Sequence, residues 1–471
     1  MQDMLPLTVG PIVGYTTSTS VRIFGRGDYQ PAQQGYKRCH GVARIKKSGD
    51  AVFPEAVVFK MNPNFDFTGI IEFLELLPEQ AYEYEMAYLF DEAEPDMINA
   101  ANLDWNEASK GSFTTAKADQ AKPISFVFGS CRYLLKLGPF NFFDDRGDKV
   151  FRSIYNQIKD DKVATDLLLM VGDQIYADDL NFVGADSTLG AYNQRYRDSF
   201  TQENIRKLMS NLPTYMILDD HEIEDNWPAK ANSRDYQDKY PSAMHAYQTY
   251  QMSHSPVLTT VSGKFVDTPD SYWYSFMNGA ANFFVMDTRT ERFVSKKEGS
   301  LKQMVNQSQL KALKEWLKTC GNDQVKFIVS GVPFFPDFTD DVSDKWGGYP
   351  AQRAEILDYI KENKITRVVF LAGDVHCSLS SQLTCEDDPS FKVTSIISSS
   401  FFWPYPQGKQ KDFQLKGHLN PIGSNKYELQ NSSEVVSDDN FTRVTLGDGF
   451  LDIGVFGRKG DVVAKGYRIS I

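Results

Sequence analysis

The chain has 471 residues, 41% of them hydrophobic and 24% charged, so it can bury a large core and is neither disordered nor collagen-like. The 62 acidic residues outnumber the 50 basic ones, which gives a net charge of -12 at pH 7. That excess argues against a basic nucleic-acid groove and against an anionic membrane as the main partner, although a bound cation can still attract a phosphate.

Residues 1–118 are predicted to form an all-β domain. Short runs rich in Val, Ile, Phe and Tyr alternate there with Gly, Pro and Asn breaks. From Tyr82 to Phe90 every second side chain is apolar, which is the period of a strand. The segment 77–81, followed by Tyr82, resembles the tyrosine corner of immunoglobulin-like and fibronectin type III sandwiches. The alternative is a strand that merely contains many tyrosines.

Residues 119–471 have the pattern of a layered α/β domain, with apolar strand-like runs separated by longer stretches compatible with helices. The predicted strands are 124–128, 166–171, 214–218, 281–286, 325–329, 367–372 and 393–397. The stretch 309–317 has the spacing of an amphipathic helix, and 352–362 resembles it more weakly. Residues 447–471 return to β structure, with a plausible hairpin turn at Gly460-Asp461.

Five of the predicted strands lead directly into residues that can bind a metal or a phosphate. The segments are Gly129-Ser130-Cys131-Arg132, Gly172-Asp173-Gln174-Ile175-Tyr176, Asp219-Asp220-His221-Glu222, Asp287-Thr288-Arg289 and Gly373-Asp374-Val375-His376. Because ligands bind at the carboxyl ends of strands in open α/β sheets, we expect these segments to meet at one edge. Asp, His, Cys and Tyr together are typical of a metal site.

Each segment has a plainer interpretation when it is taken alone. An Asp after a strand often caps the next helix, and Cys131 or Tyr176 could simply pack in the core. Asp287-Thr288-Arg289 fits a structural ion pair as well as a substrate contact. The acidic run from Asp219 to Asp225 is typical of a solvated loop. Five such segments at five strand ends nevertheless favour a metal site over five coincidences.

Taken together, these segments resemble the PhoD-like branch of the calcineurin-type metallophosphoesterases. The resemblance rests on the five junctions in the family's order and on Gly10-Pro11-Ile12-Val13-Gly14 near the start. It implies an αββα metallophosphatase sandwich preceded by an N-terminal β-sandwich domain. The implied activity is hydrolysis of phosphoesters by a metal-activated hydroxide, of the alkaline phosphatase/phosphodiesterase type, with the choice between monoesters and diesters left open.

The resemblance also implies which residues hold the metals. Asp173 would bridge two ions. Iron(III) would be held by Cys131, Tyr176 and His376, and calcium or another divalent metal by Asp220 and Asp374. Thiolate and phenolate suit ferric iron, whereas carboxylates without nitrogen partners suit calcium, so the chemistry of the residues agrees with this division.

Catalysis would use His221 to protonate the leaving oxygen, with Arg132 or Arg289 clamping the phosphate through paired N–H donors. The chain departs from the family at Asp225-Asn226, where members commonly carry two Asn, and neither residue is assigned a role. Two alternatives remain open. One is a metallophosphatase-like binding protein that no longer turns over, and the other is a structural protein stabilised by calcium.

The sequence says less about compartment and partners. No apolar run is long enough to span a membrane, and residues 1–10 lack a basic region followed by an apolar one. A cytoplasmic protein is therefore the default expectation, or an exported one if the chain is a processed form. The five Cys are scattered and odd in number, which argues against a disulfide framework. The expected partner is a small-molecule or polymer phosphoester.

Overall fold

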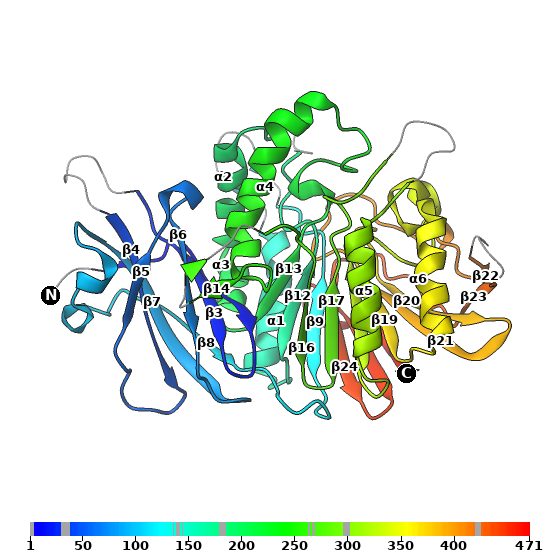
Figure 1. Ribbon diagram of the computed structural model, residues 1–471, viewed down its shortest axis with the longest axis horizontal. Helices are drawn as coiled ribbons and strands as arrows, with labels where there is room; N and C mark the ends of the chain where they lie inside the picture. The colour runs from blue at the N-terminus through cyan, green and yellow to red at the C-terminus, as the bar shows by residue number, and fades with distance from the viewer. Residues whose placement is uncertain are drawn as a thin grey trace.

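The chain folds into two bodies that follow one another along the sequence (Figure 1). The computed structural model describes residues 4–29, 38–134, 136–137, 142–143, 145–178, 185–261, 264–265, 269–294, 302–419 and 425–471. The first body is built from strands, drawn in blue, and the second combines strands with helices. Within these ranges every helix falls short of the length and apolar character that a membrane crossing requires.

The first body is a sandwich of two antiparallel sheets. One sheet has the strand order β1-β7-β4-β5, with β8 beside β7, and the other has the order β2-β3-β6. The bounds are β1 (Leu5–Pro6), β2 (Val9–Thr16), β3 (Val21–Arg26), β4 (Arg38–Lys47), β5 (Val57–Lys60), β6 (Thr68–Phe73), β7 (Ala81–Asp91) and β8 (Ser109–Thr114). Val13 and Ile23 of the second sheet share one core with Met86 of the first.

The tyrosine corner expected before β7 is present. The hydroxyl of Tyr82 accepts a hydrogen bond from the backbone N–H of Leu77 at 2.9 Å, reaching back across the bend. The alternation along β7 is also as predicted, because Tyr82, Tyr84 and Met86 are all buried in the core of the sandwich.

The second body contains two mixed sheets that pack face to face. Their strand orders are β13-β12-β9-β24-β25-β26 and β16-β17-β18-β19-β21-β20-β23-β22. The first sheet uses β9 (Ser125–Gly129), β12 (Leu167–Val171), β13 (Thr214–Ile217), β24 (Asn440–Gly447), β25 (Phe450–Gly457) and β26 (Val462–Ser470). Phe126 on β9 meets Phe283 and Phe327 of the second sheet at ring-centroid distances of 5.4 and 5.1 Å. The two sheets therefore share a core.

The second sheet also packs against helices on its other face. It uses β16 (Tyr274–Asn278), β17 (Ala281–Val285), β18 (Val325–Ser330), β19 (Val368–Ala372), β20 (Leu379–Cys385), β21 (Asp388–Ile397), β22 (Gly417–His418) and β23 (Tyr427–Gln430). On β18, Phe327 and Val329 join the core between the sheets, whereas Ile328 joins the core under the helices. This alternation is the period of two that a strand imposes.

Six α-helices lie in the described part of the second body. They are α1 (Arg146–Lys159), α2 (Leu189–Phe200), α3 (Glu203–Met209), α4 (Tyr240–Tyr250), α5 (Gln307–Thr319) and α6 (Pro350–Glu362). Leu313 of α5 and Ile356 of α6 pack with Ile328 and Phe370 of the second sheet. Short antiparallel pairs complete the fold: β10 (Lys136–Leu137) with β11 (Phe142–Phe143), and β14 (Thr260–Val261) with β15 (Lys264–Phe265).

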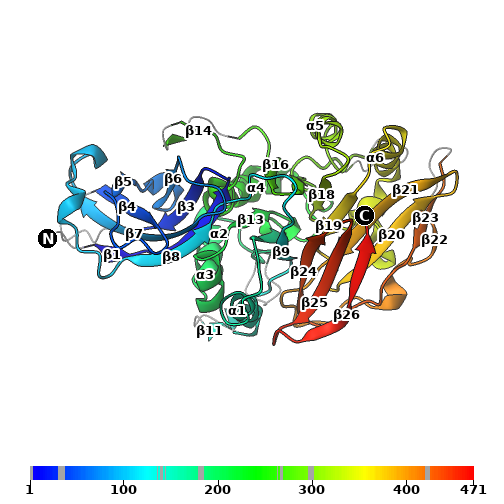
Figure 2. The ribbon, with the colours of Figure 1, turned by 90° about the horizontal axis from the view of Figure 1, so that it is seen from below.

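The elements predicted after residue 119 correspond closely to those of the structure. All seven predicted strands are present, with ends shifted by a residue or so, except that β21 begins at Asp388 rather than at 393. The two predicted helices lie within α5 and α6. Gly460 occupies the turn between β25 and β26 with a positive φ of 84°, as a hairpin glycine does. Figure 2 shows β24, β25 and β26 side by side at the end of the first sheet.

The two bodies are joined by a partly buried polar contact at Asp66, in the turn before β6. Its carboxylate accepts hydrogen bonds from Arg26 of the sandwich, from Arg197 on α2 and from Tyr250 on α4. Burial alone would raise the pKa of Asp66, but hydrogen bonds from Arg26 and Tyr250 and the charges of both arginines lower it. The sandwich is thus fixed to α2 and α4, and α2 contacts the loop after β13, where the Tyr192 hydroxyl donates to the carbonyl of Ile223 at 3.0 Å.

Candidate metal centre

The candidate site lies where parallel strands of the two sheets end. β9, β12 and β13 are parallel in the first sheet, and β17, β18 and β19 are parallel in the second. The loops that follow them are bonded to one another. Cys131 N–H donates to the carbonyl of Gly172 at 3.2 Å, and Asp374 N–H donates to the hydroxyl of Ser130 at 3.1 Å. The second of these bonds joins a loop of one sheet to a loop of the other.

Three overlapping groups of ligand-type side chains lie in these loops, with their atoms within 4.8 Å of one another in each group. The groups are Cys131–Asp173–His376, Asp173–Asp220–His221 and Asp219–Asp220–Asp374. Asp173 and Asp220 each belong to two groups, and Asp173 is the one that is also grouped with Cys131 and His376, as the expected bridging carboxylate would be. The Tyr176 hydroxyl is 3.4 Å from Asp173 Oδ2, so this residue also lies at the centre.

Four of these residues have left-handed backbone, which side chains other than glycine rarely adopt. The φ angles are 56° at Cys131, 55° at Asp173, 73° at Asp374 and 51° at His376. Each such conformation costs about 1–3 kcal/mol and persists only where the surrounding structure enforces it, typically at functional sites. Four of the six predicted ligands thus share this backbone, which nine other non-glycine residues of the described chain also adopt.

The glycines before Asp173 and Asp374 allow the loops to approach this closely. A Cβ atom on Gly172 would lie 2.4 Å from the Cβ of Asp219, and one on Gly373 would lie 2.2 Å from the Ser130 hydroxyl. Gly172 also has a positive φ of 108°. Glycine precedes both Asp173 and Asp374 because a larger side chain would clash with the neighbouring loop.

The ligand atoms are buried in a way that fits a bound cation. Among the described residues, Asp173 Oδ1 and His376 Nε2 have no hydrogen-bond partner. Burial raises the pKa of Asp173, of the Cys131 thiol and of the Tyr176 phenol well above their usual values, and it lowers that of His376 to about 3. Buried anions of these types need a positive charge beside them, and a neutral imidazole can bind it.

His221 is held by Asp178, a residue that the sequence analysis did not single out. Its Nδ1 lies 2.8 Å from Asp178 Oδ2, and the same oxygen accepts the N–H of Asp225 at 2.9 Å. Burial would lower the pKa of His221, but the charges of Asp220 and Asp178 raise it well above 6.5. The position of Asp178, two residues after Tyr176 in the same junction, was the available signal.

Glu222 joins the loops after β12 and β13. Its carboxylate accepts the N–H groups of Asp173 at 3.1 Å, Gln174 at 2.7 Å and Asp219 at 2.9 Å. Gln251 adds a side-chain donor at 3.1 Å. Glu222 is 0% exposed and Asp219 is 1% exposed, so the solvated-loop interpretation of this acidic run is wrong for both. Glu222 acts on the centre through the backbone of Asp173.

The two arginines expected to clamp the phosphate do not reach the cavity. Arg289 is fully buried and forms ion pairs with Asp219 and Asp344. Arg132 is also fully buried, and its guanidinium donates to the carbonyl of Ser199 and to Asp148. Because their N–H groups are bonded within the protein, the clamp prediction is corrected. For Arg289, the structural ion pair is the interpretation that the structure supports.

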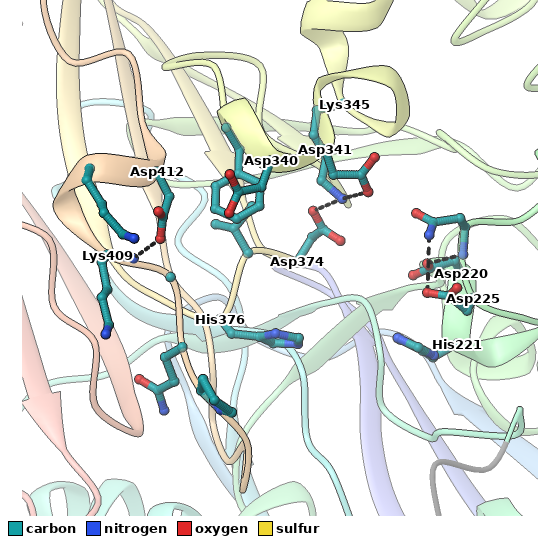
Figure 3. Close-up of a pocket in the computed structure, with 17 residues that line it drawn as sticks. Asp220, His221, Asp225, Asp340, Asp341, Lys345, Asp374, His376, Lys409 and Asp412 are labelled. Atoms are coloured by element: carbon teal, nitrogen blue, oxygen red, sulfur yellow. Dashed lines mark hydrogen bonds and ion pairs between the residues drawn. The ribbon is translucent and has the colours of Figure 1, made fainter.

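A cavity of about 440 Å³ opens onto the centre (Figure 3). Asp220, His221, Asp374 and His376 form part of its wall, and the imidazoles of His221 and His376 point toward one another across it. The remaining lining includes Asp225, Asn226, Phe338, Lys345, Lys409 and Lys411. The cavity therefore connects the ligand cluster to the outside and offers room for a substrate beside the centre.

The family model described as PhoD-like phosphatase matches residues 141–438, more than half of the chain. The chain belongs to the PhoD-like phosphatase family. The matched range contains Asp173, Tyr176, Asp220, Asp374 and His376, but it begins after Cys131. The inclusion of Cys131 therefore depends on its contacts and backbone geometry.

Two further proteins are similar to this chain. Alkaline phosphatase D of Bacillus subtilis (strain 168) is 27% identical over 294 residues, which cover 55% of this chain and 47% of that protein. The chain thus spans about half the length of this relative. A solved structure described as "Structure of PhoD" matches with a TM-score of 0.72 at 18% identity, covering 99% of this chain and 89% of that one. At this identity the likeness establishes the fold.

Proposed function

We propose that the chain is a metal-dependent phosphoester hydrolase of the alkaline phosphatase/phosphodiesterase type, built on the αββα sandwich of metallophosphatases. The observation that carries the proposal is the place of Asp173, shared by two groups of buried ligands beside an open cavity. Membership of the PhoD-like family and the similarity to an alkaline phosphatase D support the same activity.

The donor set supports two different metal positions. Cys131, Tyr176 and His376 offer a thiolate, a phenolate and an imidazole, which suit iron(III). Asp220 and Asp374 offer carboxylates, which suit calcium or another divalent cation. Asp173 is grouped with Cys131 and His376 and also with Asp220, which supports its proposed role as the carboxylate shared by the two positions. Bound metal ions supply a lowered pKa for bound water and neutralise charge on the phosphoryl oxygens.

His221 is the proposed proton donor to the leaving oxygen. Its ring lines the cavity, and its Nδ1 is occupied by Asp178, so the other ring nitrogen is the one available to a substrate. An imidazole fixed by a carboxylate in this way keeps one tautomer and one orientation. The complete donor set and the open cavity favour hydrolysis over an inactive binding protein or a structural calcium protein.

The first test is hydrolysis of bis(p-nitrophenyl) phosphate and of p-nitrophenyl phosphate at alkaline pH, with iron and calcium supplied and bound metal measured on the same sample. We expect turnover of at least one ester. Faster turnover of the diester assigns a phosphodiesterase, and faster turnover of the monoester assigns an alkaline phosphatase. Metal bound without turnover of either ester would overturn the proposal.

A further inference from the structure

An ammonium group lies among the carboxylates assigned to the second cation. Lys345 Nζ is 2.5 Å from Asp374 Oδ2 and 3.0 Å from Asp344 Oδ2, and its side chain is only 6% exposed. Figure 3 shows Lys345 reaching toward Asp374, with a dashed line between the two side chains. A second charge, Arg289 Nη2, is 3.5 Å from Asp220 Oδ1. The carboxylates of this position are thus already paired with cations of the protein.

The fold places Lys345 there firmly. It lies between two short 3-10 helices, Thr339–Asp344 and Trp346–Gly348. Trp346 is fully buried and its indole N–H donates to Ser330 Oγ at 3.1 Å. On the other side, Asp344 is held by Arg289 and Arg292. Burying an ammonium group is costly unless it is paired. The carboxylates of Asp374 and Asp344 therefore allow Lys345 to be buried at this position.

The iron side of the centre differs in this respect. In the described part of the chain no Lys or Arg forms an ion pair with Asp173, whereas Asp374 and Asp220 each have one. A divalent cation at Asp374 would meet the Lys345 ammonium at the same carboxylate, and like charges repel strongly at such distances in a buried site. Lys345 has a second acceptor available, since Asp341 Oδ2 is 3.7 Å away.

We propose that Lys345 competes with the second cation for Asp374, so that the divalent ion binds weakly and exchangeably while the iron position stays occupied. On binding of the divalent ion, the ammonium leaves Asp374 and keeps Asp344 and Asp341 as partners. Lys345 is then a positioning residue that sets how the hydrolase responds to free calcium. This inference rests on the metal centre of the proposed function.

The test is calcium titration of the iron-loaded protein by calorimetry. Lys345→Met removes the charge, Lys345→Gln removes it but keeps a donor, and Lys345→Arg keeps the charge. We expect the two neutral variants to bind calcium at least about tenfold more tightly than the original chain, and Lys345→Arg to bind it about as weakly. Lys409→Met, at another lysine that lines the cavity, is the matched control and is expected to leave calcium affinity unchanged within about threefold.

Unchanged or weaker calcium binding in both neutral variants would overturn the proposal and leave Lys345 as part of a structural ion pair. An absence of calcium binding in every variant would overturn it as well, because competition requires a second cation. Failure of the proposed function has a different signature, which is loss of bound iron and its visible absorption in the original chain. Thermal unfolding of each variant confirms that the titrated protein is folded.

Discussion

Glu222 accepts the backbone N–H of Asp173 at 3.1 Å, although the two residues follow different strands. The same carboxylate oxygen accepts the N–H of Asp219 at 2.9 Å. Glu222 thereby closes the loop after β12 onto the loop after β13 and supports the left-handed backbone of Asp173. The orientation of the Asp173 carboxylate therefore depends on Glu222, which acts through the backbone of Asp173.

Glu222→Gln is expected to lower kcat by about tenfold or more while leaving KM nearly unchanged. The amide NH2 would face N–H donors, and leaving buried donors unsatisfied costs about 1–3 kcal/mol. The visible absorption of bound iron should shift as the ligands move, which a general loss of stability would not cause. Glu224→Gln, at a less buried neighbour that pairs with Lys239, is the control. An unchanged kcat and spectrum in Glu222→Gln would refute the positioning role.

Asp178→Asn should move the pH profile of hydrolysis. The charges of Asp220 and Asp178 raise the pKa of His221, so removal of one of them lowers it. If His221 must be protonated to donate to the leaving oxygen, activity falls as pH rises through its pKa. The alkaline limb of kcat/KM should therefore shift to lower pH in the variant, together with a lower maximum. A limb that stays in place would exclude His221 as the group that titrates there.

Removal of the metals should bleach and destabilise the protein together. Phenolate and thiolate on ferric iron absorb visible light, so the purified holoprotein is expected to be coloured and to lose its colour on chelation. Loss of the cations leaves the buried Asp173 carboxylate without a positive partner, which lowers the free energy of unfolding. Spectra and thermal unfolding before and after chelation measure both effects. A colourless protein with bound calcium would support the structural alternative instead.

Asp66→Asn is expected to destabilise the chain by about 3 kcal/mol, because it leaves Arg26 and Arg197 without their shared carboxylate. The pKa of Asp66 is lowered on folding, so its contribution is fully present above the unfolded value of about 3.9 and is lost as pH falls through the folded value. Urea unfolding at pH 7 and at decreasing pH should show the two proteins converging in acid. Asp50→Asn, at an exposed site of the same sandwich, should have little effect at either pH. A gap that stays constant into acid would contradict this account.

Most of the candidate site could be predicted from the residues that directly follow each apolar run. This prediction needs only the positions at which the apolar runs stop. It brought Asp173, Asp220 and Asp374 together from segments far apart in the chain, and parallel pairing in both sheets is the reason. The glycines that precede Asp173 and Asp374 could be found in the same way. These features are local in sequence, so hydrophobic periodicity is enough to predict them.

The sequence could not show which way a side chain turns. Arg132 and Arg289 stand at strand ends like the ligands, yet each points to buried acceptors supplied by distant segments. Lys345 had no motif around it, because its role arises only when Asp374 lies beside it in the fold. Tertiary pairing of charges of this kind has no signature in spacing.

We expect Asp173 to organise the metals that hydrolyse the phosphoester. The most direct test is Asp173→Asn, with bound iron and calcium quantified and hydrolysis of bis(p-nitrophenyl) phosphate measured on the same sample beside the original chain and Asp161→Asn, an exposed acid of the same domain. We predict that Asp173→Asn loses metal and turnover together, whereas Asp161→Asn keeps both. Full turnover in Asp173→Asn, with or without its metal content, would contradict the account.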